Sequence, residues 1–136
     1  MTGAGRSEER GARMVDTRII VAGLWIAVML TFLLGDVLRI FAGDFTAGEI
    51  AGKPMTQGMW LLIAAIMLTP IIMVVLSLIL PYPAIKWVCI VLAVLWVIFN
   101  LAGLPYKGLY DNFLIGVSFI FCGLIVWYAW TWPVPA

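Results

Sequence analysis

Two ionisable side chains of opposite charge, Asp36 and Arg39, lie inside the first long apolar segment, which runs from about Ile19 to Phe41. Residues three positions apart are neighbours on a helix surface, so a carboxylate and a guanidinium at this spacing can form an ion pair. Ionisable residues are costly in a membrane-length helix and mark candidate functional positions there. The pair therefore indicates a structural ion pair, a polar binding pocket or a proton-carrying carboxylate.

Three further polar residues, Asn100, Lys107 and Asp111, are expected at the same level. At a rise of about 1.5 Å per residue, Asp36 lies roughly 25 Å along its helix, and Asn100 lies roughly 20 Å along its own. Both then fall in the outer third of a hydrocarbon core about 30 Å thick. If the first and last helices are neighbours, Arg39 can reach Asp111 as well as Asp36. We predict an outer-leaflet polar cluster as the candidate binding site: Asp36, Arg39, Asn100, Lys107 and Asp111.

The residues that most metal and redox sites need are scarce. The chain has no histidine, which is the commonest metal ligand and the usual general base near neutral pH. Its two cysteines, Cys89 and Cys122, are far apart and form no C-x-x-C motif. We expect both to be small buried apolar residues, and we predict no cofactor, no metal and no catalytic residue.

The composition predicts a membrane protein. Of the 136 residues, 65% are hydrophobic and 11% are charged, whereas soluble domains are about 45–50% apolar and about a quarter charged. The length accommodates about four spans of about 20 residues. We predict an all-α, antiparallel four-helix membrane bundle, which forms a single membrane domain over residues 17–136 after a disordered cytoplasmic tail at 1–16. The spans are expected at about 19–41, 57–80, 84–104 and 109–132.

Local patterns predict how the spans pack. Small residues recur every four positions in the first span, at Gly23, Ala27, Thr31 and Gly35, and such a ridge favours close approach of another helix. Pro70 removes one helical hydrogen bond near the middle of the second span, so we expect a kink there.

The longest connection covers about residues 42–55. Its Thr46-Ala47-Gly48-Glu49 stretch matches a capping box and predicts a short surface helix, although Gly48 and Gly52 oppose helix formation. The next connection is the tight Pro81-Tyr82-Pro83 turn, which is expected to hold the third span beside the second.

The distribution of basic residues predicts the orientation. The side that holds the termini has five of them and the opposite side has three. Cytoplasmic loops carry an excess of lysine and arginine, so both termini are expected in the cytoplasm. The compact loops and the lack of secretory processing indicate a bacterial inner membrane. The five residues are Arg6, Arg10, Arg13, Arg18 and Lys86, and the three are Lys53, Lys107 and Arg39.

Four short motifs carry a resemblance that extends over most of the chain: Gly23-Leu24-Trp25-Ile26, Gly35-Asp36, Thr56-Gln57-Gly58 and Trp127-Tyr128-Ala129-Trp130. They resemble bacterial four-helix membrane families of unknown function, which are broadly similar to DoxX-type proteins. The resemblance implies a fold and no activity. Four short spans with an acid in the first also resemble the small multidrug-resistance transporters. In those, the carboxylate sits near mid-helix without an adjacent arginine, unlike Asp36.

Three functions remain open. The first is a non-catalytic membrane protein, either an accessory subunit or a binder of lipid or a small amphiphile through the polar cluster. The second is a small proton-coupled transporter in which Asp36 titrates. The third is a membrane enzyme that acts on a lipid-soluble substrate, with Asp36 or Asp111 as acid or base. The expected partners are membrane lipids, with a possible homo-oligomer or larger membrane complex and no nucleic acid.

Overall fold

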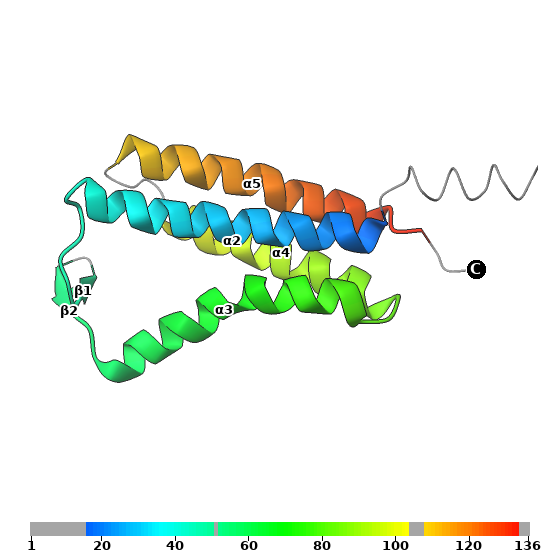
Figure 1. Ribbon diagram of the computed structural model, residues 1–136, viewed down its shortest axis with the longest axis horizontal. Helices are drawn as coiled ribbons and strands as arrows, with labels where there is room; N and C mark the ends of the chain where they lie inside the picture. The colour runs from blue at the N-terminus through cyan, green and yellow to red at the C-terminus, as the bar shows by residue number, and fades with distance from the viewer. Residues whose placement is uncertain (1–15, 51, 104–107, 134–136) are drawn as a thin grey trace, which may run out of the picture.

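Four helices make up most of the computed structural model, which describes residues 16–50, 52–103 and 108–133 (Figure 1). Each helix is long and apolar enough to cross a membrane, as the hydropathy predicts. The predicted tail before residue 16 and Lys107 lie outside the described residues. The helices are α2 (Thr17–Phe41), α3 (Gln57–Ile79), α4 (Ala84–Gly103) and α5 (Leu109–Trp130).

Side-chain caps set where two of the helices begin. The Asp16 carboxylate accepts a hydrogen bond from the backbone N–H of Arg18 at 2.9 Å, at the start of α2. The Thr56 hydroxyl accepts one from the backbone N–H of Met59 at 3.3 Å, at the start of α3. Each cap satisfies an N–H group that has no partner inside its helix.

Arg18 closes the opposite end of α3. Its Nη1 donates hydrogen bonds to the backbone oxygens of Ser77 at 3.2 Å and Leu80 at 2.6 Å. Its guanidinium also lies 5.4 Å from the ring centre of Trp132. A cation suits the last carbonyl groups of a helix, so Arg18 ties the start of α2 to the end of α3.

Helix α2 lies at the centre of the contacts between helices. It packs against α3 and α5, and α5 in turn packs against α4. The beginning of α2 and the end of α5 lie at the same end of the molecule (Figure 1). Helix α3 was expected beside α4, but it touches α4 sparsely and makes most of its contacts with α2. The few contacts between α3 and α4 include a hydrogen bond from Trp96 to Thr69 near the middle of α3.

The first half of α3 leans away from the other helices (Figure 1). Its buried residues are Pro70, Met73 and Ser77, which all lie in the second half. Proline at position 70 has no N–H group to offer the carbonyl oxygen of Ile66, one turn earlier. Helix α3 bends near Pro70, as the sequence predicts.

The Thr69 hydroxyl supplies the donor that Pro70 lacks. It donates to the backbone oxygen of Ile66 at 2.7 Å and accepts a hydrogen bond from Nε1 of Trp96 on α4 at 3.1 Å. A buried carbonyl without a donor costs free energy. The chain of bonds from Trp96 through Thr69 to Ile66 therefore satisfies the bend and links it to α4.

The core packs side chains from all four helices. Its fully buried members include Trp25 of α2, Met73 of α3, Ile85 of α4 and Ile125 of α5. Both cysteines are also free and buried, as expected for small apolar side chains.

The connection between α2 and α3 forms a small hairpin instead of the expected surface helix. Strand β1 (Glu49–Ile50) pairs antiparallel with β2 (Lys53–Pro54), and Ile50 lies opposite Lys53. Gly48 and Gly52 have φ angles of +81° and +79°. Glycine adopts positive φ at little cost, so the two glycines that oppose a helix favour this reversal.

The predicted ridge of small residues on α2 is only partly used. Thr31 and Gly35 are buried, but Gly23 is exposed and has nothing within 4 Å of the place where a Cβ atom would stand. The buried face follows Val21, Trp25 and Val28 instead. Large side chains therefore form the contact where a close approach of backbones was expected.

Candidate functional site

The polar cluster is centred on a two-pronged contact between Arg39 and Asp111. Nη2 of Arg39 donates to Oδ1 of Asp111 at 3.1 Å, and Nε donates to Oδ2 at 3.4 Å. Asp111 is only 7% exposed. Arginine offers parallel N–H groups that match the two oxygens of a carboxylate. The contact joins the last turn of α2 to the first turn of α5, so these two helices run in opposite directions.

Gly35 lies where the two helix ends meet. A Cβ atom at Gly35 would meet a Leu114 side-chain carbon at 3.5 Å and Oδ1 of Asp111 at 3.7 Å. These are ordinary contact distances, so the position is closely packed but has room for a Cβ atom. Gly35 is therefore a buried member of the predicted small-residue ridge, but the approach of the two helices does not require a glycine there.

Asp36 is the outer member of the cluster. Its Oδ1 lies 3.6 Å from Nη1 of Arg39, and its side chain is 57% exposed. The predicted pair of Asp36 and Arg39 therefore exists, but the contact across to Asp111 is shorter and better buried. Arg39 lies between two carboxylates, and the three side chains together carry one net negative charge.

A second contact near the cluster was not anticipated. The Tyr110 hydroxyl of α5 donates a hydrogen bond to the Asp44 carboxylate in the connection after α2. Asp44 and Tyr110 each follow a helix boundary in the sequence. Their pairing depends on α2 and α5 being neighbours, and no local spacing signals it.

Asn100 does not join this group directly. It is buried in α4 and donates its amide hydrogen to the backbone oxygen of Trp96 at 2.9 Å, one turn earlier in the same helix. Of the five predicted site residues, the structure therefore brings Asp36, Arg39 and Asp111 together. Lys107 lies outside the described residues.

The described residues hold no group of three His, Cys, Asp or Glu side chains that could bind a metal ion. The exposed carboxylate of Asp36 is best suited to an electrostatic contact with a positively charged group.

Asp36 shares a face of α2 with two apolar residues. Met29, Phe32 and Asp36 follow one another at steps of three and four, which places them along one side of the helix. The seven steps from Met29 to Asp36 span about 10 Å along the helix. This side faces the region that the bend of α3 opens, because Phe32 contacts Trp96 of α4 at a ring separation of 5.0 Å and Met29 lies opposite α3.

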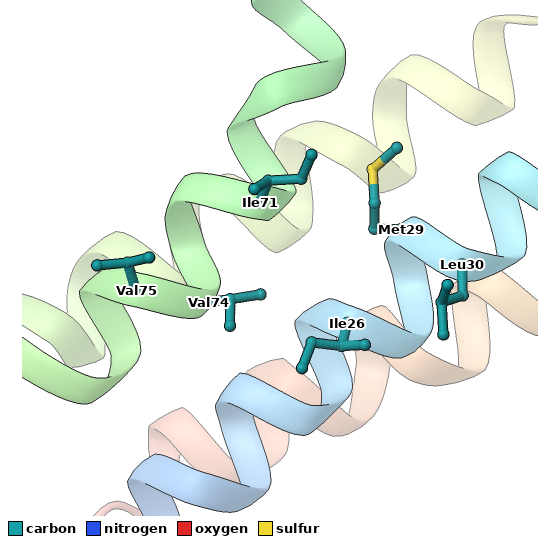
Figure 2. A pocket seen from close by; sticks show the side chains of 6 residues that line it. All are labelled: Ile26, Met29, Leu30, Ile71, Val74 and Val75. Atoms are coloured by element: carbon teal, nitrogen blue, oxygen red, sulfur yellow. The ribbon is translucent and has the colours of Figure 1, made fainter.

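Two apolar grooves line this region. The first, which we call the α2–α3 groove, has a volume of about 280 Å³ (Figure 2). Figure 2 shows side chains from both helices along it, without a polar group among them. It is lined by Ile26, Met29 and Leu30 of α2 and by Ile71, Val74 and Val75 of α3.

The second groove, which we call the α3–α4 groove, lies at the bend and has a volume of about 410 Å³. Leu92, Leu95 and Phe99 line its α4 side. The bonded pair of Thr69 and Trp96 also lines it, but the hydroxyl and the indole N–H group bond to each other, and the groove surface is almost entirely apolar. Ligand sites in proteins have volumes of about 300–1,000 Å³, and the volume of this open groove falls within that range.

These features define the class of the protein. It is an all-helical chain with four helices that are long and apolar enough to span a membrane, with a charged cluster at one end of the helices. Residues 14–134 match the model of a family of unknown function, and the chain belongs to this family, DUF6326. No curated protein and no solved structure matches the chain.

Proposed function

We propose that the protein is a non-catalytic, multi-pass membrane protein that binds a lipid or another small amphiphile beside α3. The observation that carries this proposal is the bend at Pro70, which leaves apolar grooves on both sides of α3. A groove without polar atoms in a membrane-length helix pair suits a hydrocarbon chain. Asp36 lies on the same side of α2 as Met29, which lines the α2–α3 groove.

The charge of the cluster supports a head group with an ammonium. Two carboxylates share the Arg39 guanidinium, so the cluster attracts a cation more than a phosphate. Asp36 is the exposed carboxylate and is the proposed contact, and Arg39 and Asp111 are proposed to hold it in place. Asn100 and Lys107 stay as predicted members of the site.

The membrane arrangement is also part of the proposal. We propose that the four helices insert as an antiparallel bundle with both termini in the cytoplasm, in a bacterial inner membrane and with a broadly DoxX-like architecture. The sequence supports this orientation, because the side that holds the termini has five basic residues against three on the opposite side, and cytoplasmic ends are richer in arginine and lysine.

Removing the Asp36 charge tests the head-group contact. The protein is reconstituted in nanodiscs that contain phosphatidylethanolamine, and native mass spectrometry counts the lipids that it retains. Asp36→Asn keeps the side-chain shape and removes the charge, so we expect retention of phosphatidylethanolamine to fall several-fold. An exposed ion pair contributes little to stability, so folding should be preserved.

Glu49→Gln provides the control, because Glu49 is a carboxylate at the same end of the molecule but lies on the hairpin strand β1. It should retain as much phosphatidylethanolamine as the unchanged protein. Equal retention by Asp36→Asn and the unchanged protein would contradict the proposed contact.

A further inference from the structure

The end of the molecule opposite the charged cluster carries a lysine held by two tryptophans. Nζ of Lys86 lies 5.3 Å from the ring centre of Trp87 and 5.1 Å from that of Trp130. The two rings meet edge to face, with centres 6.2 Å apart and an angle of 86°. Trp87 belongs to α4 and Trp130 to α5, so the ammonium is fixed where two helix ends meet.

Lys86 has no carboxylate partner among the residues that the structure describes. The described ion pairs all involve Arg39. The carboxylate of Asp16, which lies at this end of the molecule, accepts a hydrogen bond from the backbone N–H group of Arg18. An ammonium has three hydrogen-bond donors, and the faces of the two rings satisfy its charge without accepting conventional hydrogen bonds. These donors can therefore serve an external acceptor.

The backbone adds to the positive potential at this place. Lys86 lies in the first turn of α4, which contains no acidic residue. The first turn of a helix carries a partial positive charge from its N–H groups, so a lysine here favours a nearby anion. The charge of Lys86 and the partial positive charge of the helix end therefore both attract an anion.

The two tryptophans suit the border of a membrane. Trp87 is 51% exposed and Trp130 is 61% exposed. Tryptophan is enriched where the acyl region meets the head groups, because its ring is amphipathic. A phosphate at this depth would be carried on a lipid.

We propose that Lys86, Trp87 and Trp130 form a second binding site, which takes the phosphate group of an anionic lipid. The Lys86 ammonium donates to the phosphate oxygens, and the two indole rings hold the ammonium and pack against the lipid. The site rests on the proposed membrane insertion, but it uses none of the residues of the Asp36 site. The two ends of the bundle then select head groups of different charge.

Native mass spectrometry from nanodiscs with mixed phosphatidylglycerol and phosphatidylcholine tests this site. We expect the unchanged protein to retain phosphatidylglycerol preferentially and Lys86→Gln to retain roughly fivefold less, which is the contribution of one lysine near a membrane surface. Lys86→Arg keeps the charge and should retain the lipid. Retention of phosphatidylglycerol by Lys86→Gln at the unchanged level would overturn the proposal.

Lys53→Gln is the matched control, because Lys53 is an exposed lysine on β2 at the opposite end. It should leave the retention unchanged, and an equal loss in this variant would show a general charge effect and no site. An excess of inorganic phosphate, compared with chloride at equal ionic strength, should leave the lipid bound. Displacement by phosphate alone would assign the site to a free anion and overturn the lipid assignment.

The two proposals fail separately. If Asp36→Asn loses phosphatidylethanolamine and Lys86→Gln retains phosphatidylglycerol, only the Asp36 site is supported. The reverse result would leave only the second. If neither lipid is retained by the unchanged protein, both proposals are wrong.

Discussion

Arg39 links two carboxylates that differ in burial. Asp111 is almost fully buried and receives two hydrogen bonds, whereas Asp36 is more than half exposed and lies at 3.6 Å. A carboxylate removed from water depends on its partner far more than an exposed one does. Asp111 therefore contributes to the stability of the cluster, and Asp36 remains available to a ligand.

This difference predicts unequal effects on stability. Asp111→Asn should lower the free energy of unfolding by about 2 kcal/mol, because it weakens two hydrogen bonds to a charged group. Asp36→Asn should lower it by less than about 1 kcal/mol, as for an exposed ion pair. Unfolding in mixed micelles, followed by circular dichroism, measures both. A larger loss for Asp36→Asn than for Asp111→Asn would contradict this account of the cluster.

The sequence predicted both ion pairs of Arg39 but not which of them is closer. Asp36 and Arg39 are three residues apart on one helix, so their contact follows from helical geometry. Which carboxylate binds Arg39 more closely depends on how α2 is rotated toward α5, and that rotation is a result of tertiary packing. The bond between Tyr110 and Asp44 joins a helix to a connection, and no periodicity signals such a contact.

Helix α3 is the element that shapes both grooves. The sequence predicted its bend from Pro70 alone, because the missing N–H group is a property of the residue. It did not predict that α3 packs on α2 rather than α4, because α3 is apolar on all sides and no stripe marks a preferred neighbour. The sequence also did not predict the hydrogen bond from Trp96 to Thr69, because this bond depends on how α3 and α4 pack.

The Thr69 hydroxyl donates one hydrogen bond and accepts another, so its removal should lower the free energy of unfolding more than the loss of a single hydrogen bond. Thr69→Val leaves the Ile66 oxygen and the Trp96 N–H group without partners, so the free energy of unfolding should fall by about 1–3 kcal/mol. Thr31→Val is the control, since the Thr31 hydroxyl also donates one turn back, to the Ala27 oxygen at 2.7 Å. No proline follows Ala27 in α2, so a backbone N–H group one turn later still serves the Ala27 oxygen. Thr31→Val should therefore lower the free energy of unfolding by less than Thr69→Val.

Pro70→Ala provides the decisive comparison for this element. An alanine at position 70 offers the Ile66 oxygen a backbone N–H group, so Thr69→Val should cost less in this background than in the unchanged protein. Thermal unfolding of the single and double variants measures the difference. Fully additive effects would show that the hydroxyl does not replace the missing donor.

The whole molecule has two chemically different ends. One end holds the carboxylates of Asp36 and Asp111 around Arg39 and the bonded pair of Asp44 and Tyr110, and the other holds Arg18 and Lys86 among tryptophans. The apolar grooves lie along α3 between these ends. Composition and hydropathy predicted the helices, but the grooves come from an imperfect fit between helices, which depends on tertiary packing.

Filling the α3–α4 groove tests the central claim that an amphiphile binds beside α3. Leu95 and Leu101 are both on α4 and both 53% exposed, but only Leu95 lines the groove. Native mass spectrometry of the two tryptophan variants from nanodiscs with phosphatidylethanolamine compares the lipid that each retains. We predict that Leu95→Trp loses the lipid several-fold, because its larger ring occupies the groove, while Leu101→Trp retains it. Undiminished retention by Leu95→Trp would contradict the claim.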